Sequence, residues 1–173
     1  MVLGTHAVIG GTLGAVSRAH PIIAFLVGFI SHFLLDTIPH WDYKLLSSTK
    51  RKTDNPLDGD MVLGKEFIRD IICIGVDFGI GIIVTSFLFL SGYLGGEEVL
   101  VPLIFGALGG VAPDFLQFAY MKIRKEPLVS LQKFHIFIHA KKRLDGQFII
   151  GPILQIVMAL ILLIVAHSFS LIL

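Results

Sequence analysis

Five long apolar stretches divide the chain, and each one predicts a helix. A transmembrane helix needs about 20 predominantly apolar residues. Two stretches reach that length, and the other three reach it only if the polar residues at their ends lie at membrane depth. Such polar groups are costly there unless they face the protein interior and are paired. We therefore predict an all-α, single domain over residues 1–173, an integral membrane bundle of about five transmembrane helices. The stretches run approximately over residues 7–17, 22–35, 71–90, 99–112 and 148–173.

The composition agrees with a membrane protein. Charged residues make up 16% of the chain, against about 25% in ordinary soluble domains, and the mean hydropathy is +0.83. These values exclude a nucleic-acid-binding domain and a disordered chain, whereas the formal net charge of +1 by itself indicates no partner. The single cysteine, Cys73, excludes an internal disulfide, and its apolar surroundings predict a small buried side chain.

Most lysines and arginines lie in two connections, residues 39–66 and 122–143, whereas residues 91–98 contain none. Cytoplasmic loops of membrane proteins carry an excess of these residues. The distribution predicts a protein of the cytoplasmic (inner) membrane with both long connections and the N-terminus on the cytoplasmic side. A short amphipathic segment is expected near residues 131–143.

Glycines four residues apart recur in three of the apolar stretches. Small residues at this spacing let transmembrane helices approach closely. The pattern predicts ordinary helix packing at Gly10 and Gly14, Gly75 and Gly79, and Gly106 and Gly110.

The strongest chemical signal is the segment 31–42, SHFLLDTIPHWD. His32 and Asp36 are four residues apart and share a helical face, where an imidazole and a carboxylate can chelate one metal ion. A proline disfavours helix at the residue before it, so the helix should end near residue 38 and turn His40 and Asp42 back toward the membrane surface. The alternative is a simple His32–Asp36 pair at a helix end.

Two further candidates lie in other stretches. His6 stands at the mouth of the first stretch, where the alternative is an interfacial histidine. Asp77 lies inside an apolar span, which is expensive and indicates a functional site; the alternative is a buried hydrogen bond to a neighbouring helix.

Three more candidates follow later in the chain. Pro113 should end or kink its helix and aim Asp114, unless that aspartate is only a solvated helix terminus. His135 and His139 share one face of a helix or strand. Their alternative is an interfacial amphipathic segment whose polar face is histidine.

The predicted topology places all these groups on the cytoplasmic side. Four histidines and several carboxylates exceed one tetrahedral site, so two or more ions are expected. The divalent metal is expected to be zinc, with manganese or magnesium as alternatives. The predicted ligands are His6, His32, Asp36, His40, Asp114, His135 and His139.

Three motifs resemble those of the membrane-bound metal-dependent hydrolases, a family distantly similar to zinc-dependent phospholipase C. They are THxxxG at 5–10, SHxxxDxxPHxD at 31–42 and APD at 112–114. The resemblance covers roughly the first 120 residues. It implies an α-helical fold, a histidine/aspartate metal site and hydrolysis of a phosphoester or related bond. It also implies that His6, His32, Asp36 and Asp114 are ligands, with His135 and His139 in the place of a later ligand pair.

Together these observations predict a metal-dependent hydrolase that acts on a lipid or lipid-linked phosphoester at the cytoplasmic interface. Membrane lipids are its expected partners, and Asp42 or Asp77 is its expected general base. The alternative is a metal-ion carrier, or a metal-stabilised membrane scaffold without catalytic activity. Intramembrane Asp77 suits a transport path equally well.

Overall fold

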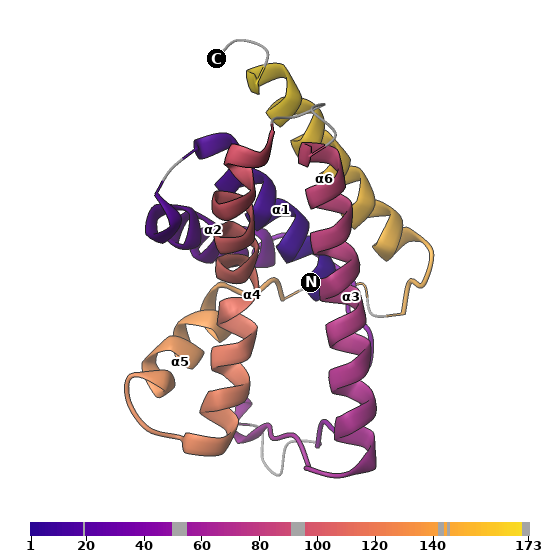
Figure 1. Cartoon of the computed structure of the whole chain (residues 1–173). Helices are drawn as coiled ribbons and strands as arrows, with labels where there is room; N and C mark the ends of the chain where they lie inside the picture. The colour runs from indigo at the N-terminus through magenta and orange to yellow at the C-terminus, as the bar shows by residue number, and fades with distance from the viewer. Residues whose placement is uncertain (19, 50–54, 91–95, 142–143, 145, 171–173) are drawn as a thin grey trace.

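Each predicted apolar stretch forms a helix, and the chain is all-helical. A computed structural model describes residues 1–18, 20–49, 55–90, 96–141, 144 and 146–170 (Figure 1). Within these ranges there is no strand, only an isolated antiparallel bridge between Ser48 and Met61. Six α-helices and two 3₁₀ turns are described: α1 (Leu3–Ser17), α2 (Pro21–Asp36), η1 (Pro56–Asp58), α3 (Lys65–Leu90), η2 (Glu97–Val99), α4 (Leu100–Ile123), α5 (Leu128–Ile138) and α6 (Ile150–Ser170).

Two of the described helical segments are long and apolar enough to cross a membrane. They are Lys65–Phe89, which belongs to α3, and Glu97–Ile123, which comprises η2 and α4. Helices α1 and α2 have 15 and 16 residues, fewer than the roughly 20 that a span requires. The five predicted spans are therefore not confirmed.

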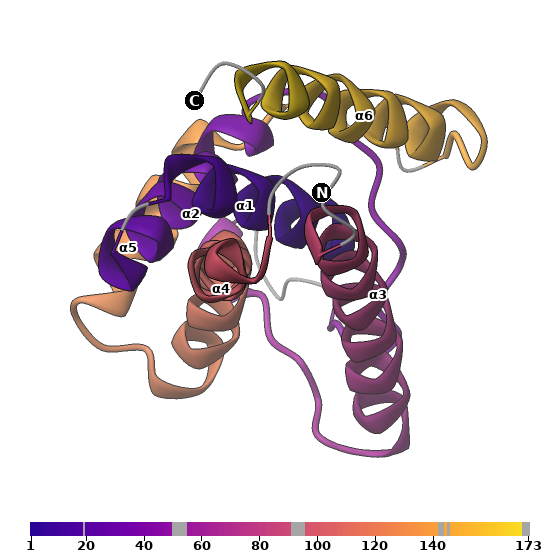
Figure 2. The same cartoon turned by 45° about the horizontal axis from the view of Figure 1, so that its top comes forward.

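Helix α1 packs against α2, α3, α4 and α6 and forms the centre of the bundle (Figures 1 and 2). Glycines permit its closest approach to α4, because a Cβ atom on Gly10 would lie 2.5 Å from the Gly106 carbonyl oxygen. The glycine pair on α3 has no such contact. A Cβ atom on Gly75 or Gly79 would meet no described atom within 4 Å, so these glycines are not packing positions here.

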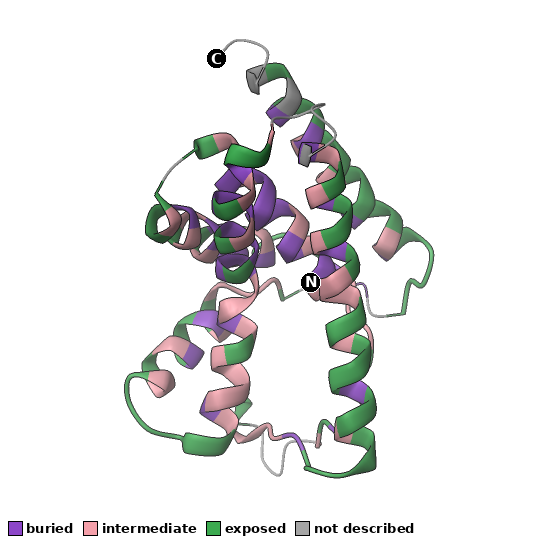
Figure 3. Cartoon of the chain, in the orientation of Figure 1, coloured by how far each residue is buried: buried purple, intermediate pink, exposed green. Residues whose placement is uncertain are grey.

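Many side chains on the outer faces of the helices are large and apolar. Figure 3 marks the exposed residues in green. Cys73 is exposed on α3, so the expectation of a buried thiol is wrong; the helix turns this side chain outward among other apolar ones. The exposed apolar side chains include Ile22 and Leu34 on α2, Ile72, Ile83 and Phe87 on α3, and Ile153 and Ile164 on α6.

The two lysine- and arginine-rich connections meet at one end of the molecule. Tyr120 Oη and Arg124 Nη1 both donate to the Leu57 carbonyl oxygen at 3.0 Å, and Lys122 Nζ donates to Asp60 Oδ1 at 2.7 Å. The Lys122 ammonium lowers the pKa of the Asp60 carboxyl. These contacts fix the first connection against the end of α4.

Two predictions about the second half of the chain have different outcomes. Of the end or kink predicted at Pro113, the end is excluded, because α4 continues to Ile123. The predicted amphipathic segment forms helix α5, with His135 buried and Phe137 84% exposed.

Candidate metal centre

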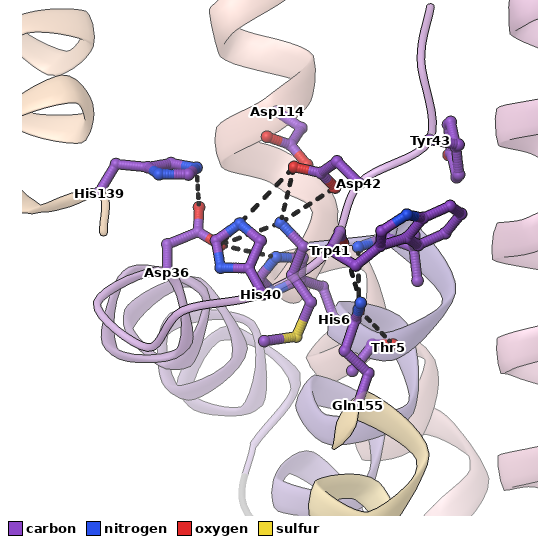
Figure 4. A network of polar contacts seen from close by, with 12 residues as sticks. Thr5, His6, Asp36, His40, Trp41, Asp42, Tyr43, Asp114, His139 and Gln155 are labelled. Carbon is purple, nitrogen blue, oxygen red and sulfur yellow. Dashed lines mark hydrogen bonds and ion pairs between the residues drawn. The ribbon is translucent and has the colours of Figure 1, made fainter. Parts of the chain in front are cut away.

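Predicted ligands from distant segments converge on the Asp36 carboxylate (Figure 4). Asp36 is the last residue of α2 and is 1% exposed. Helix α1 supplies His6 and α4 supplies Asp114. The segment after α2 supplies His40 and Asp42. His32 lies on α2 itself, His135 lies on α5, and His139 caps the C-terminus of α5.

The two oxygens of Asp36 divide the histidines into two sets. Asp36 Oδ1 lies 3.2 Å from His6 Nε2 and 3.8 Å from His40 Nε2. Asp36 Oδ2 lies 3.3 Å from His32 Nε2, 2.9 Å from His135 Nε2 and 3.8 Å from His139 Nε2.

A second carboxylate accompanies each set. Asp42 Oδ2 lies 3.6 Å from His40 Nε2, and Asp114 Oδ1 lies 3.7 Å from His32 Nε2. Both aspartates are partly exposed, at 23% and 32% of their side-chain surface, whereas Asp36 is not. The centre therefore has a buried carboxylate in the middle and a more accessible one on each side.

Backbone carbonyls orient two of the imidazoles. His32 Nδ1 lies 2.7 Å from the Gly110 carbonyl oxygen, and His40 Nδ1 lies 2.7 Å from that of Ile38. A carbonyl accepts only, so each Nδ1 carries a proton, and each Nε2 faces the Asp36 carboxylate. Metal-binding histidines are held in this way.

Pro113 lies in α4, three residues after the carbonyl that His32 contacts. Proline has no N–H to donate to the Gly109 carbonyl. One residue further on, the Gly110 carbonyl accepts the proton of His32. Neighbouring helices commonly satisfy backbone groups that a proline frees.

Several nitrogen atoms at the centre have no hydrogen-bond partner among the described residues. Nδ1 of His6 and Nε2 of His40 are buried in this state. Nε2 of His6 lies 3.2 Å from Asp36 Oδ1 without the alignment of a hydrogen bond. His32 Nε2 lies 3.4 Å from His135 Nε2. Buried polar atoms are rarely left unpaired, so the arrangement calls for a cation among them.

The donor set fits a divalent metal. Four overlapping groups of three residues each bring their ligand atoms within 4.8 Å of one another. Burial lowers the pKa of His139, which favours the neutral imidazole that coordinates metals. The groups are His6–His32–Asp36, His32–Asp114–His135, Asp36–His135–His139 and His40–Asp42–His139.

A positive group already lies among these carboxylates. The α-amino group of Met1 is 3.3 Å from Asp36 Oδ1 and 3.3 Å from Asp42 Oδ1. The space between the two aspartates therefore accommodates a cationic group.

The structure places Asp77 apart from the four groups. Its Oδ2 accepts the Gly4 backbone N–H at 2.7 Å and the Tyr43 hydroxyl at 3.5 Å. Burial and the nearby Asp77 raise the pKa of Tyr43, which keeps its hydroxyl protonated. Asp77 thus binds the start of α1 at Gly4, two residues before His6.

Gln155 is a residue that the sequence reasoning missed. Its Oε1 accepts from the Val2 backbone N–H at 3.2 Å and from Thr5 Oγ1 at 3.3 Å, and its Nε2 donates to the Trp41 carbonyl at 2.8 Å. The signal was present, because Gln155 is one of few polar residues in the last apolar stretch. It joins the two segments that carry His6 and His40.

No protein-family model, curated protein or solved structure matches this chain.

Proposed function

We propose that this chain is a membrane-bound, metal-dependent hydrolase that cleaves a phosphoester in a lipid or lipid-linked substrate. One observation carries the proposal: imidazoles and carboxylates from four helices and one connecting segment converge on Asp36. The resemblance of three motifs to the membrane-bound metal-dependent hydrolases supports the same class.

The overlapping ligand groups around Asp36 favour two cations. His6, His32 and Asp36 would hold one, and Asp36, His135 and His139 would hold the other, with Asp36 between them. His40 and Asp114 lie beside these two groups. When bound, such cations polarise phosphoryl oxygens and lower the pKa of water to about 7.

The chain's own residues would orient the reaction. Of the two aspartates predicted as general base, Asp42 lies beside the centre and is partly exposed, so we assign the role to Asp42. The Nδ1–H bonds of His32 and His40 to backbone carbonyls hold their rings in place. Asp77 and Gln155 fix the start of α1 and thereby the position of His6.

We further propose that the centre lies at the cytoplasmic surface of the inner membrane, with the N-terminus on that side. The apolar outer faces of α2, α3 and α6 suit a bilayer. The two basic connections meet at a single end of the molecule, in keeping with the positive-inside rule. The centre would then lie at the depth of lipid headgroups.

Metal analysis of the purified protein tests the metal centre. We expect about two divalent ions per chain, as in two-metal hydrolases. His32→Ala and Asp36→Ala should lose metal, whereas His20→Ala, at an exposed histidine that caps the start of α2, should retain it. Unchanged metal content in both centre variants would contradict the proposal.

Lipid turnover and ion flux separate the hydrolase from a carrier. Vesicles of phosphatidylethanolamine and phosphatidylglycerol should release phosphorylated headgroups in the presence of the metal-loaded protein but not of Asp36→Ala. Zinc flux into liposomes should stay at the protein-free level. Zinc flux without lipid turnover would contradict the hydrolase and support the alternative function, a metal-ion carrier.

A further inference from the structure

A groove opens beside the metal centre between α1, α3 and α6. Its volume is about 410 Å³, within the range of about 300–1,000 Å³ that small-molecule sites occupy. Its accessible lining is almost entirely carbon, so it suits a hydrocarbon. The apolar lining residues include Val8, Ile80, Val84, Ile156, Leu160 and Leu163.

The groove and the centre share two segments of the chain. Gly4 and Thr5 line the groove, and His6 follows them on α1. Trp41 also lines it, between His40 and Asp42 in the sequence. Figure 4 shows Trp41 and Thr5 on the opposite side of the polar network from His139. A molecule in the groove would therefore have one end within reach of the centre.

Two polar side chains at this end are already engaged by the protein. Asp77 accepts the Gly4 N–H, and Gln155 bonds to Val2, Thr5 and Trp41. The buried indole N–H of Trp41 has no partner among the described residues. The groove itself thus suits a chain without polar groups rather than a headgroup. The polar part of any ligand has its partners in the neighbouring centre.

The surroundings of the groove indicate where such a chain comes from. Helix α3 carries exposed Ile83 and Phe87, and α6 carries exposed Ile153 and Ile164. A bilayer around these faces would supply acyl chains directly to the groove.

We propose that this groove holds one acyl chain of a membrane lipid whose phosphate headgroup lies at the metal centre. The inference rests on the proposed function, because the centre supplies the headgroup site. It narrows the substrate class to phospholipids and excludes soluble phosphoesters, which have no hydrocarbon for the groove.

Photo-crosslinking tests this placement. Phosphatidylglycerol with a diazirine in one acyl chain is incorporated into nanodiscs of phosphatidylethanolamine and phosphatidylglycerol that contain the zinc-loaded protein. We expect crosslinks on the groove faces of α1, α3 and α6. Diacylglycerol with the same chain should label the groove several-fold less, and removal of zinc should lower labelling by the phospholipid to that level.

Two neighbouring tryptophan substitutions provide a matched pair. Val84 lines the groove, whereas Ile83 is 68% exposed and lies outside the lining. Val84→Trp should fill the groove and reduce groove labelling several-fold, and Ile83→Trp should leave it unchanged. Metal content, measured on the same samples, should match the unmodified protein in both variants and shows that each has folded.

Several outcomes would overturn the inference. Equal labelling by phosphatidylglycerol and diacylglycerol, or equal labelling of the two variants, would mean that lipid merely surrounds the helices. A dimer that Val84→Trp dissociates would show that a second copy fills the groove. Turnover without groove labelling defeats this inference alone, whereas zinc-dependent labelling without turnover supports it and defeats the hydrolase.

Discussion

His32 shows how far single residues could be predicted. Its spacing from Asp36 predicted a shared helical face, and His32 Nε2 lies 3.3 Å from Asp36 Oδ2. The proton on Nδ1 could not be predicted, because its acceptor is the backbone carbonyl of Gly110, and a carbonyl carries no side-chain signal. The division of five imidazoles between two oxygens of one carboxylate depends equally on packing between helices.

Substitution of Asp77 separates a positioning role from a catalytic one. Asp77→Ala leaves the Gly4 N–H without its acceptor, which costs about 1–3 kcal/mol when the donor is buried. We expect a lower unfolding midpoint and weaker metal binding, because α1 carries His6. In Asp77→Asn the amide oxygen accepts the same N–H, so metal content and turnover should stay close to those of the unmodified protein.

The measurements are thermal unfolding in detergent, metal titration and lipid turnover. Loss of turnover in Asp77→Asn with unchanged metal binding would return Asp77 to the role of general base. His20→Ala, at an exposed histidine outside the metal centre, is the control variant in all three measurements.

At the scale of helices, the apolar stretches predicted where helices form better than which neighbouring helices they pack against. All five stretches form helices, and α5 forms within the expected amphipathic region. The sequence left open whether α4 ends or only kinks at Pro113, because a proline's local preference does not report the tertiary contacts that stabilise the next turns. Glycine spacing likewise marks close packing in α1 and α4 but not in α3.

Two alanine substitutions test the glycine contacts. The added Cβ in Gly10→Ala would meet the Gly106 carbonyl oxygen, and overpacking of this kind costs about 1–3 kcal/mol. Gly75→Ala adds its Cβ to open space and gains about 0.4–1 kcal/mol from the reduced freedom of the unfolded chain. Thermal unfolding in detergent should therefore shift down for the first and up for the second. Equal shifts would show that α1 and α4 are not in close contact.

At the scale of the whole molecule, helical content was predicted better than the number of spans. Two helical segments meet the length and hydropathy of a span, fewer than the five expected. The shorter helices end in polar residues that turn inward to the centre, as His32 and Asp36 do on α2. Counting apolar residues cannot distinguish such ends from solvated ones.

Cysteine labelling tests the proposed orientation. In a Cys73→Ser background, Glu97→Cys places a thiol on exposed η2 and Ser130→Cys places one on exposed α5. An impermeant maleimide should label residue 97 in intact cells, and residue 130 only after permeabilisation. The reverse pattern would show that the topology is inverted. Labelling of both residues in intact cells would show that no membrane separates them.

The sequence distance between ligands has a consequence for biosynthesis. Asp36 and His135 are 99 residues apart in the chain, yet their side chains meet at 2.9 Å. Translation therefore completes α2, with its carboxylate, well before α5 can supply an imidazole. Under the proposed membrane placement, a nascent chain would enter the bilayer before Asp36 meets the His135 imidazole. Metal binding would then be a late step that joins α5 to the helices made before it.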